Sequence, residues 1–389
     1  MKITAIEKTV RQYLENGEIA GGILIVRRKD HLLYKGKWGY ADIASCRPAE
    51  YGDIWRMMTM TKPVTAVAVM QLAEAGKLDI DRPVSDWLPA FAHPRVAADE
   101  RYGEDWAKLE QYRDGFTPEG VKTVPASRPF TARDLLTHSA GLEEGTVVLL
   151  CGAFRGERMT LADVVDHYAR WPLDFEPGAR TAYSPQAGFD VLARLVEIVS
   201  GEDADSYFKK HIFEPLEMEG ARFFPTEEVF RRVVTLYERR NGVLTDVTAE
   251  AEVYGHIAPK GSSYTAGGAG LYSTAEDYDR FAHMLAAEGE RRGARILKAE
   301  TVRMMREEAL LRKSGGAAVW GLGMMIRERP GEMGSACPPG AYGWSGAFGT
   351  HFVIDPSDGT SFVWVTNRTD LNGSGSYISA KMEELVFGN

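Results

Sequence analysis

Strand-like segments lie at both ends of this 389-residue chain, and helix-like segments fill the middle. "GGILIVRRKD" and "LLYKGKWGYADI" read as two strands joined by a tight turn at Lys29–His31. "WGLGMMIRE", "GAYGWSGAFGTHFVIDP" and "TSFVWVTNRT" have the same character near the C-terminus. Strands from two distant parts of a chain can share one sheet only if the residues between them form an insertion. We therefore predict an α+β fold with one antiparallel sheet and an inserted, mostly helical subdomain.

Two predicted helices, of which the first is amphipathic, complete this expected architecture. "MKITAIEKTVRQYLENGE" and "SYISAKMEELVF" predict terminal helices that flank the sheet. We expect a single catalytic domain over 1–389, with an α/β subdomain formed by 1–55 and 265–389 and a helical subdomain over 56–264.

The middle of the chain shows helix boundaries and one irregular stretch. Gly76 suits the end of a helix over "KPVTAVAVMQLAEAGKLD", "TARDLLTH" and "TLADVVDHYAR" begin at capping threonines, and "GFDVLARLVEIVSG" is amphipathic. Residues 93–130 are polar and irregular, which is typical of a functional or mobile loop. Within that loop, Trp106 and Tyr112 either face a pocket or anchor the loop to the surface.

Charge and cysteine content exclude several classes of protein. The net charge of −9 argues against a nucleic-acid partner and against a polybasic membrane surface. Cys46, Cys151 and Cys337 are far apart and lack C-x-x-C spacing, so neither a disulfide framework nor a zinc site is expected. Neither a signal-peptide pattern nor an apolar run of membrane-spanning length is present. We expect a soluble, cytoplasmic protein without a metal, a cofactor or a membrane partner.

"TMTK" places a hydroxyl and an amine three residues apart at a predicted helix start. Thr59 and Lys62 would share one face of that helix, and a buried lysine can accept a hydroxyl proton. Backbone N–H groups at a helix N-terminus can stabilise an oxyanion. A bare [ST]-x-x-K pattern is common by chance, so its surroundings must decide.

"TMTKPVTAVAVMQLAEAGKLDIDRPVSDWLP" resembles the active-site helix of the class C β-lactamase and family VIII carboxylesterase group of penicillin-recognising serine hydrolases. The resemblance continues, in the family's order, at "RPFTARDLLTHSAGL", "YSPQAGFDVLARLVEIVSG", "GGAGLYSTAEDYDRFAHMLA" and "GWSGAFGTHFVIDP". It covers most of the chain and implies a β-lactamase/transpeptidase-like fold. It also implies a hydrolase that forms a covalent acyl-enzyme with small carboxylic esters, amides or β-lactams.

The resemblance also assigns roles to individual residues. Lys62 matches the lysine of the family's S-x-x-K motif, and Tyr183 in "YSP" matches the tyrosine that contributes to proton transfer. The alternative for Tyr183 is a core tyrosine at a helix start. For His138, in the "LLTH" segment, we expect a structural hydrogen bond.

"WSG" corresponds to the family's third motif, on a strand at the edge of the cleft. The resemblance implies an oxyanion hole made by the N–H groups of Thr59 and Ala347. The small residues Ser345, Gly346 and Ala347 would let substrate approach this strand, although Gly346 also suits a hairpin or bulge. Trp344 stands where β-lactamases usually carry lysine, which removes a cation suited to the β-lactam carboxylate and favours esters.

Thr59 stands where the family has its nucleophilic serine. Branching at Cβ restricts χ1, and the methyl must fit beside the oxyanion hole, so a weakened enzyme is expected. Thr61 faces away from Lys62, and neither Ser139 nor Ser184 has a suitably spaced lysine. Thr59 therefore remains the best candidate. Three functions stay open: a hydrolase using Thr59, an acyltransferase on the same scaffold, and a catalytically impaired ligand-binding homologue.

Overall fold

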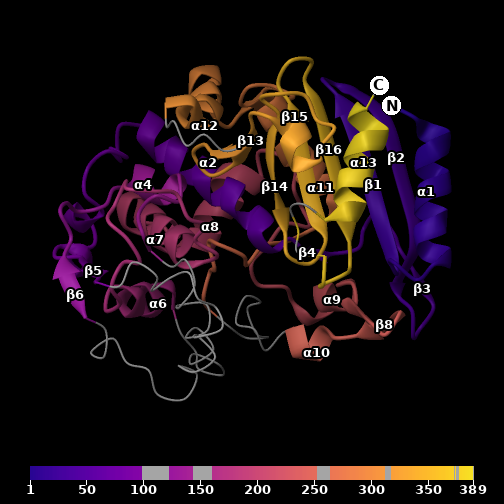
Figure 1. Ribbon diagram of the computed structural model, residues 1–389, viewed down its shortest axis with the longest axis horizontal. Coiled ribbons are helices and arrows are strands. Elements are labelled where there is room, and N and C mark those ends of the chain that lie inside the picture. The colour runs from indigo at the N-terminus through magenta and orange to yellow at the C-terminus, as the bar shows by residue number, and fades with distance from the viewer. Residues whose placement is uncertain are drawn as a thin grey trace.

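The computed structural model describes residues 1–98, 122–142, 160–251, 263–311, 317–371, 373 and 376–388. Its main element is an eight-stranded antiparallel sheet built from both ends of the chain (Figure 1). In spatial order the strands are β12 (Ala318–Trp320), β13 (Met325–Arg327), β14 (Tyr342–Gly346), β15 (Thr350–Asp355), β16 (Thr360–Thr366), β1 (Gly21–Arg28), β2 (His31–Asp42) and β3 (Arg47–Pro48). The predicted fold class is confirmed, and the turn between β1 and β2 lies where the sequence placed it.

Helices cover both faces of this sheet. The terminal helices α1 (Ile3–Glu15) and α13 (Tyr377–Phe387) lie side by side on one face, and α11 (Ala275–Ala286) crosses the other. Residues alternate between the faces along each strand: Leu24 packs with the terminal helices, whereas Ile25 belongs to the larger core that includes α11. The sheet is therefore buried on both sides.

Most of the α-helices that the structure describes lie between β3 and α11. The helices are α2 (Thr61–Glu74), α4 (Ala132–Leu136), α6 (Leu161–Tyr168), α7 (Ala187–Ser200), α8 (Ala204–Phe208), α9 (Glu227–Phe230) and α10 (Thr248–Ala251), and α12 (Ala299–Leu311) follows α11. The short turns are η1 (Met58–Met60), η2 (Val84–Asp86), η3 (Pro89–Phe91), η7 (Lys209–Phe213) and η9 (Pro330–Met333). The division into two subdomains remains a prediction.

Local sequence signals account for several of these helix boundaries. Thr131 and Thr160 each form a capping box with an aspartate three residues later, which satisfies two backbone N–H groups. Gly76 and Gly201 have positive φ angles of 65° and 74° just beyond α2 and α7. Glycine adopts that conformation without the penalty that a Cβ atom brings, so these helices end there.

Four short two-stranded sheets supplement the large one. They pair β4 (Trp55–Arg56) with β9 (Tyr272–Ser273), β5 (Arg95–Ala97) with β6 (Thr123–Pro125), β7 (Tyr237–Arg240) with β8 (Val243–Asp246), and β10 (Glu290–Arg291) with β11 (Ala294–Arg295). The β5–β6 pair lies in the stretch that the sequence analysis read as irregular, because strands of three residues give almost no periodic signal. The β7–β8 hairpin turns at Asn241–Gly242, a tight-turn dipeptide that the sequence analysis overlooked. Trp106 and Tyr112 lie outside the described residues.

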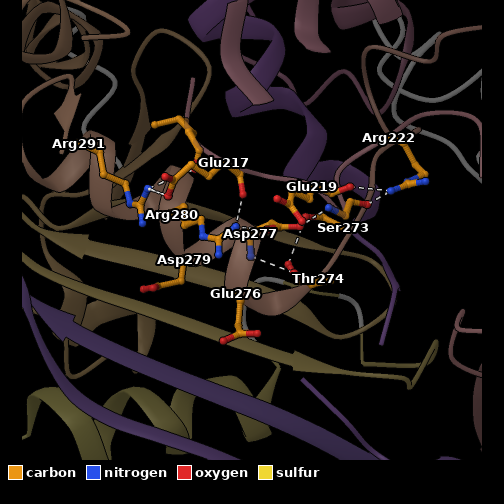
Figure 2. A network of polar contacts seen from close by, with 12 residues as sticks. Glu217, Glu219, Arg222, Ser273, Thr274, Glu276, Asp277, Asp279, Arg280 and Arg291 are labelled. Carbon is orange, nitrogen blue, oxygen red and sulfur yellow. Dashed lines mark hydrogen bonds and ion pairs between the residues drawn. The ribbon is translucent and has the colours of Figure 1, made fainter. Parts of the chain in front are cut away.

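A polar network fixes α11 against its neighbours (Figure 2). Thr274 caps the helix by accepting a hydrogen bond from Asp277 N–H (3.0 Å), and the Asp277 carboxylate accepts from Gly220 N–H (2.7 Å) and from Arg280 (2.8 Å). Further along α11, the hydroxyl of Tyr278 donates to the carbonyl of Met60 (2.8 Å). The network thereby holds α11 in place, and α11 in turn supports the turn that contains Thr59.

Candidate active site

Thr59 lies on η1, the short turn that leads into α2. The chain enters this turn from β4, and Met58 adopts a left-handed conformation with φ 49°, which is unusual for a residue with a side chain. The hydroxyl of Thr59 donates a hydrogen bond to the carbonyl oxygen of Ser345 on β14. The start of α2 is therefore tied to the strand that carries the third motif.

Thr61, the neighbouring hydroxyl, is fixed by the backbone. Its Oγ1 donates to Met58 O (2.6 Å) and accepts from Leu271 N–H (3.0 Å), and the side chain is fully buried. Both partners of the Thr61 hydroxyl are backbone groups, which gives Thr61 a structural role, and the choice of Thr59 as the nucleophile remains a prediction.

Lys62 is completely buried on the first turn of α2. Its Nζ donates to the carbonyl oxygens of Pro185 (2.5 Å) and Gly268 (2.9 Å). The same nitrogen lies 5.0 Å from the centroid of the Tyr183 ring and 5.5 Å from that of Phe189. The amine is thus held between the segment that carries Tyr183 and the loop before β9.

Trp344 joins Tyr183 in an aromatic cluster. The Tyr183 ring is stacked on Trp320, with centroids 5.6 Å apart and an interplanar angle of 17°, and lies 5.3 Å from the ring of Trp344. Trp320 and Trp344 meet edge to face at 4.3 Å. The contacts from Thr59 to β14, from β14 to Tyr183 and from Tyr183 to Lys62 bring four sequence-predicted residues together.

Gly346 is required by close packing against the segment before Thr59. A Cβ atom there would collide with the Met57 carbonyl oxygen and with Thr350 Oγ1. Thr350 Oγ1 itself donates to that carbonyl at 3.1 Å. Regular pairing of Gly346 with Thr350 excludes a bulge. The hairpin alternative agrees with the structure, because Gly346 ends β14 and its carbonyl oxygen accepts from Gly349 N–H (3.2 Å) in the turn. Ala347 follows in the turn after β14, and its oxyanion role remains a prediction.

Ser345 directs its side chain away from Trp344, to the opposite face of the sheet. Its Oγ lies 2.6 Å from His351 Nδ1, and His351 Nε2 lies 2.7 Å from Glu383 Oε1 on α13. The order Ser–His–Glu matches that of a hydrolase triad. Ser345 is only 3% exposed, however, and the bonded hydroxyl faces the terminal helices, so this chain of bonds supports β14.

Ion pairing keeps the Glu383 carboxylate, at the end of this series of hydrogen bonds, ionised. Burial alone would raise the pKa of Glu383, but the hydrogen bonds from His351 and Ser335 and the charge of Arg327 lower that pKa to about 2. Arg327 donates to the same carboxylate at 2.9 Å. Burial lowers the pKa of His351, against the pull of Glu383, so we assign a neutral imidazole beside an ionised carboxylate. Sequence analysis missed this Ser–His–Glu arrangement because His351 and Glu383 lie 32 positions apart.

Asp190 on α7 is a second buried carboxyl group that the sequence analysis missed. Its Oδ1 accepts from Gly268 N–H (3.2 Å), and its Oδ2 accepts from the hydroxyls of Tyr168 (3.2 Å) and Tyr264. Burial raises the pKa of Asp190 to about 7, although these hydrogen bonds and the charge of Lys62 oppose the rise. The Gly268 peptide therefore links the two buried groups, since its N–H donates to Asp190 and its carbonyl accepts from Lys62.

His138 makes the structural hydrogen bonds that its position in "LLTH" predicted. Its Nδ1 accepts from Ser184 N–H (2.9 Å), and its carbonyl oxygen accepts from Ala182 N–H (2.9 Å). These two donors flank Tyr183 in sequence, so His138 contacts the chain on both sides of the candidate proton-transfer residue.

The described residues bear on metal binding and on membrane insertion. No three His, Cys, Asp or Glu side chains among them are grouped so that they could hold a metal ion. Within the same residues, no helix has the length and apolar character of a membrane span.

Comparison with known proteins places this site in a family. Residues 6–386 match the beta-lactamase family. Protein Rv1367c of Mycobacterium tuberculosis (strain ATCC 25618 / H37Rv) is 30% identical over 378 residues, covering 92% of this chain and 88% of that protein. Esterase EstB of Burkholderia gladioli is 27% identical over 403 residues, covering 97% and 93%. The solved structure of EstCE1, a hydrolase with promiscuous acyltransferase activity, has a TM-score of 0.79 at 24% identity, covering 99% and 98%. Since the family match spans nearly the whole chain, the protein belongs to the beta-lactamase family, as its five ordered motif segments predicted.

Proposed function

We propose that this protein is a hydrolase of the esterase/β-lactamase type that cleaves small carboxylic esters through an acyl–Thr59 intermediate. The supporting observation is the continuous set of contacts from Thr59 through β14 and Tyr183 to Lys62. An ester bound against β14 would meet a hydroxyl, a buried amine and a phenol within one cluster. The similarity to an esterase over nearly the full length of both chains supports the same reaction class.

The proposed reaction has two halves. In the first, the Thr59 hydroxyl attacks the ester carbonyl while Lys62 and Tyr183 take up its proton, and the N–H groups of Thr59 and Ala347 stabilise the oxyanion. Collapse of the tetrahedral intermediate breaks the ester C–O bond, and the departing alkoxide receives that proton. In the second, water attacks the acyl group in the same way and releases the carboxylic acid and the Thr59 hydroxyl.

The substrate proposal rests on the wall that faces Tyr183. Trp344 supplies an apolar aromatic surface in the motif position where β-lactamases usually carry a cation. An uncharged acyl or aryl group would pack there, whereas the carboxylate of a penicillin would lack a charged partner. A cytoplasmic location and small acyl substrates belong to the same proposal and rest on composition and motifs.

Acylation of the whole protein tests this function. The protein is incubated with p-nitrophenyl acetate and butyrate, nitrophenol release is recorded, and intact mass is measured after acid quenching. We expect turnover together with an acyl adduct that maps to Thr59 and is missing from Thr59→Ala. If neither the wild-type protein nor Thr59→Ser forms an adduct or releases nitrophenol, the protein is better described as a ligand-binding homologue.

Acyl transfer is the second candidate, because the structurally similar EstCE1 is described as a hydrolase with promiscuous acyltransferase activity. An alcohol would then replace water in the second half of the reaction. Addition of a primary alcohol to the p-nitrophenyl butyrate assay would yield its butyrate ester. If butyric acid is the sole product over a range of alcohol concentrations, the transferase alternative is excluded for that acceptor.

A further inference from the structure

His138 occupies a strained and fully enclosed position beside the proposed site. It follows α4 with φ 53°, in the left-handed region that residues with a side chain seldom adopt, although Asn, Asp and His do so more often than the others, and it is 2% exposed. Unfavourable backbone conformations persist where surrounding interactions over-determine them. The contacts of His138 therefore indicate what holds this conformation in place.

Three contacts connect His138 to the segment that carries Tyr183. The carbonyl oxygen of His138 accepts from Ala182 N–H and its Nδ1 accepts from Ser184 N–H, both at 2.9 Å. Its imidazole also lies against the Tyr183 ring, with centroids 4.9 Å apart. One residue thus holds the peptide groups on both sides of Tyr183 and packs on its ring.

The bond to Ser184 fixes the tautomer of the imidazole. Because Nδ1 accepts a hydrogen bond from Ser184 N–H, the ring proton of neutral His138 lies on Nε2. Burial, and then the charge of Lys62, keep the pKa of His138 well below its ordinary value, so the ring stays neutral. Protonation of Nδ1 would place two donors against each other and release Ser184. Neutrality is therefore part of the geometry.

We propose that His138 is a positioning residue that fixes the Tyr183 phenol relative to Lys62 by holding the two peptide groups that flank Tyr183. This inference rests on the proposed hydrolase function, since Tyr183 acts there in proton transfer. His138 itself touches neither the substrate nor the reacting atoms. Its effect on the reaction passes through Tyr183.

Two amide substitutions distinguish the role of Nδ1 from that of Nε2. In His138→Asn the side-chain oxygen can take the place of Nδ1 and accept from Ser184 N–H, and asparagine tolerates positive φ. In His138→Gln the amide reaches toward the place of Nε2 and leaves Ser184 N–H without its acceptor. We expect kcat on p-nitrophenyl butyrate to stay within about threefold for Asn and to fall about 100-fold for Gln, with KM within about twofold, because a displacement of about 1 Å has that effect on rate.

A double-mutant cycle distinguishes positioning from general destabilisation. If His138 acts through Tyr183, His138→Gln should lower kcat by less than about threefold in a Tyr183→Phe background, because the phenol hydroxyl is already absent there. An equal loss in both backgrounds would overturn the proposal, and so would wild-type kcat in His138→Gln. His167→Gln, which changes a half-buried histidine on α6, controls for the substitution itself and should leave kcat unchanged.

Structural readouts keep this inference separable from the function. Crystal structures of both variants should show a displaced Tyr183 ring in His138→Gln and an undisplaced ring in His138→Asn, whether or not esters are hydrolysed. Absence of wild-type turnover would refute the hydrolase proposal, whereas an undisplaced ring in His138→Gln would refute the positioning role. If His138→Gln does not fold, ¹⁵N NMR of the wild-type histidines decides: a neutral Nε2–H tautomer from pH 6 to 8 supports the role, and a titrating ring overturns it.

Discussion

Replacing Thr59 with serine measures what the extra methyl group does in this site. The Thr59 hydroxyl donates to the Ser345 carbonyl, so it must leave that acceptor before it can pass its proton toward Lys62. Rotation about χ1 carries the Cγ2 methyl of this half-buried side chain to a new position among its neighbours. Serine can make and break the same hydrogen bond, so this bond cancels in the comparison. The difference between the two proteins therefore measures the effect of the methyl group.

The size of the effect follows from the rotamer penalty. A side chain forced about 30° from its preferred χ angle costs roughly 0.5–1.5 kcal/mol. A barrier lower by ~1.4 kcal/mol raises a rate about tenfold. We therefore expect kcat/KM of Thr59→Ser on p-nitrophenyl butyrate to exceed the wild-type value by about two- to tenfold. The other predicted catalytic groups stay in place, so KM should change little.

The control variants lie on η1 and on the first turn of α2. Thr61→Ser removes the same methyl group two residues further along the chain. Among the described contacts, the Thr61 hydroxyl bonds only Met58 and Leu271, so this variant should keep kcat/KM within about twofold of the wild-type value. Thr59→Ala and Lys62→Ala should abolish turnover. An unchanged rate in Thr59→Ser, with an inactive Thr59→Ala, would mean that the pocket has adapted to threonine. Wild-type turnover in Thr59→Ala would remove Thr59 from the nucleophile role.

The remaining predictions concern substrate, pH and stability. Short-chain and aryl esters should be turned over faster than penicillins, and EDTA should not reduce the rate; a preference for a penicillin, or loss of activity on chelation, would contradict the ester proposal. The kcat/KM profile should show an inflection near pH 7 from Asp190, whose pKa burial raises to about 7, and Asp190→Asn should remove it. Glu383 has its pKa lowered from 4.5 to about 2, so its ion pair stabilises the fold above pH 4.5 by roughly 3 kcal/mol, and this contribution is lost as the pH falls from 4.5 toward 2. Thermal unfolding of the wild type should therefore become steeply pH-dependent in that window, while Glu383→Gln should be less stable at pH 7 and less sensitive to acid; an equal acid response in both would refute the assignment.

The sequence alone determined which segments form strands and helices, and several of their ends. Apolar spacing, capping threonines and a glycine such as Gly76 act over a few residues, so their signals are complete within short windows. The ordered motifs also identified Thr59, Lys62, Tyr183 and the β14 strand, because each belongs to a local pattern. Where a local signal is weak, as in the three-residue strands β5 and β6, the prediction failed.

Only the tertiary structure decided how these residues are oriented and supported. Thr59 turns its hydroxyl to a carbonyl 286 positions away, and Glu383 reaches His351 across 32 positions. Asp190 and His138 look in sequence like ordinary residues of a helix and a turn. In the folded protein, burial raises the pKa of Asp190, and His138 packs against the Tyr183 ring beside the site. Such effects depend on which surfaces exclude water together, and that is settled only when distant segments pack.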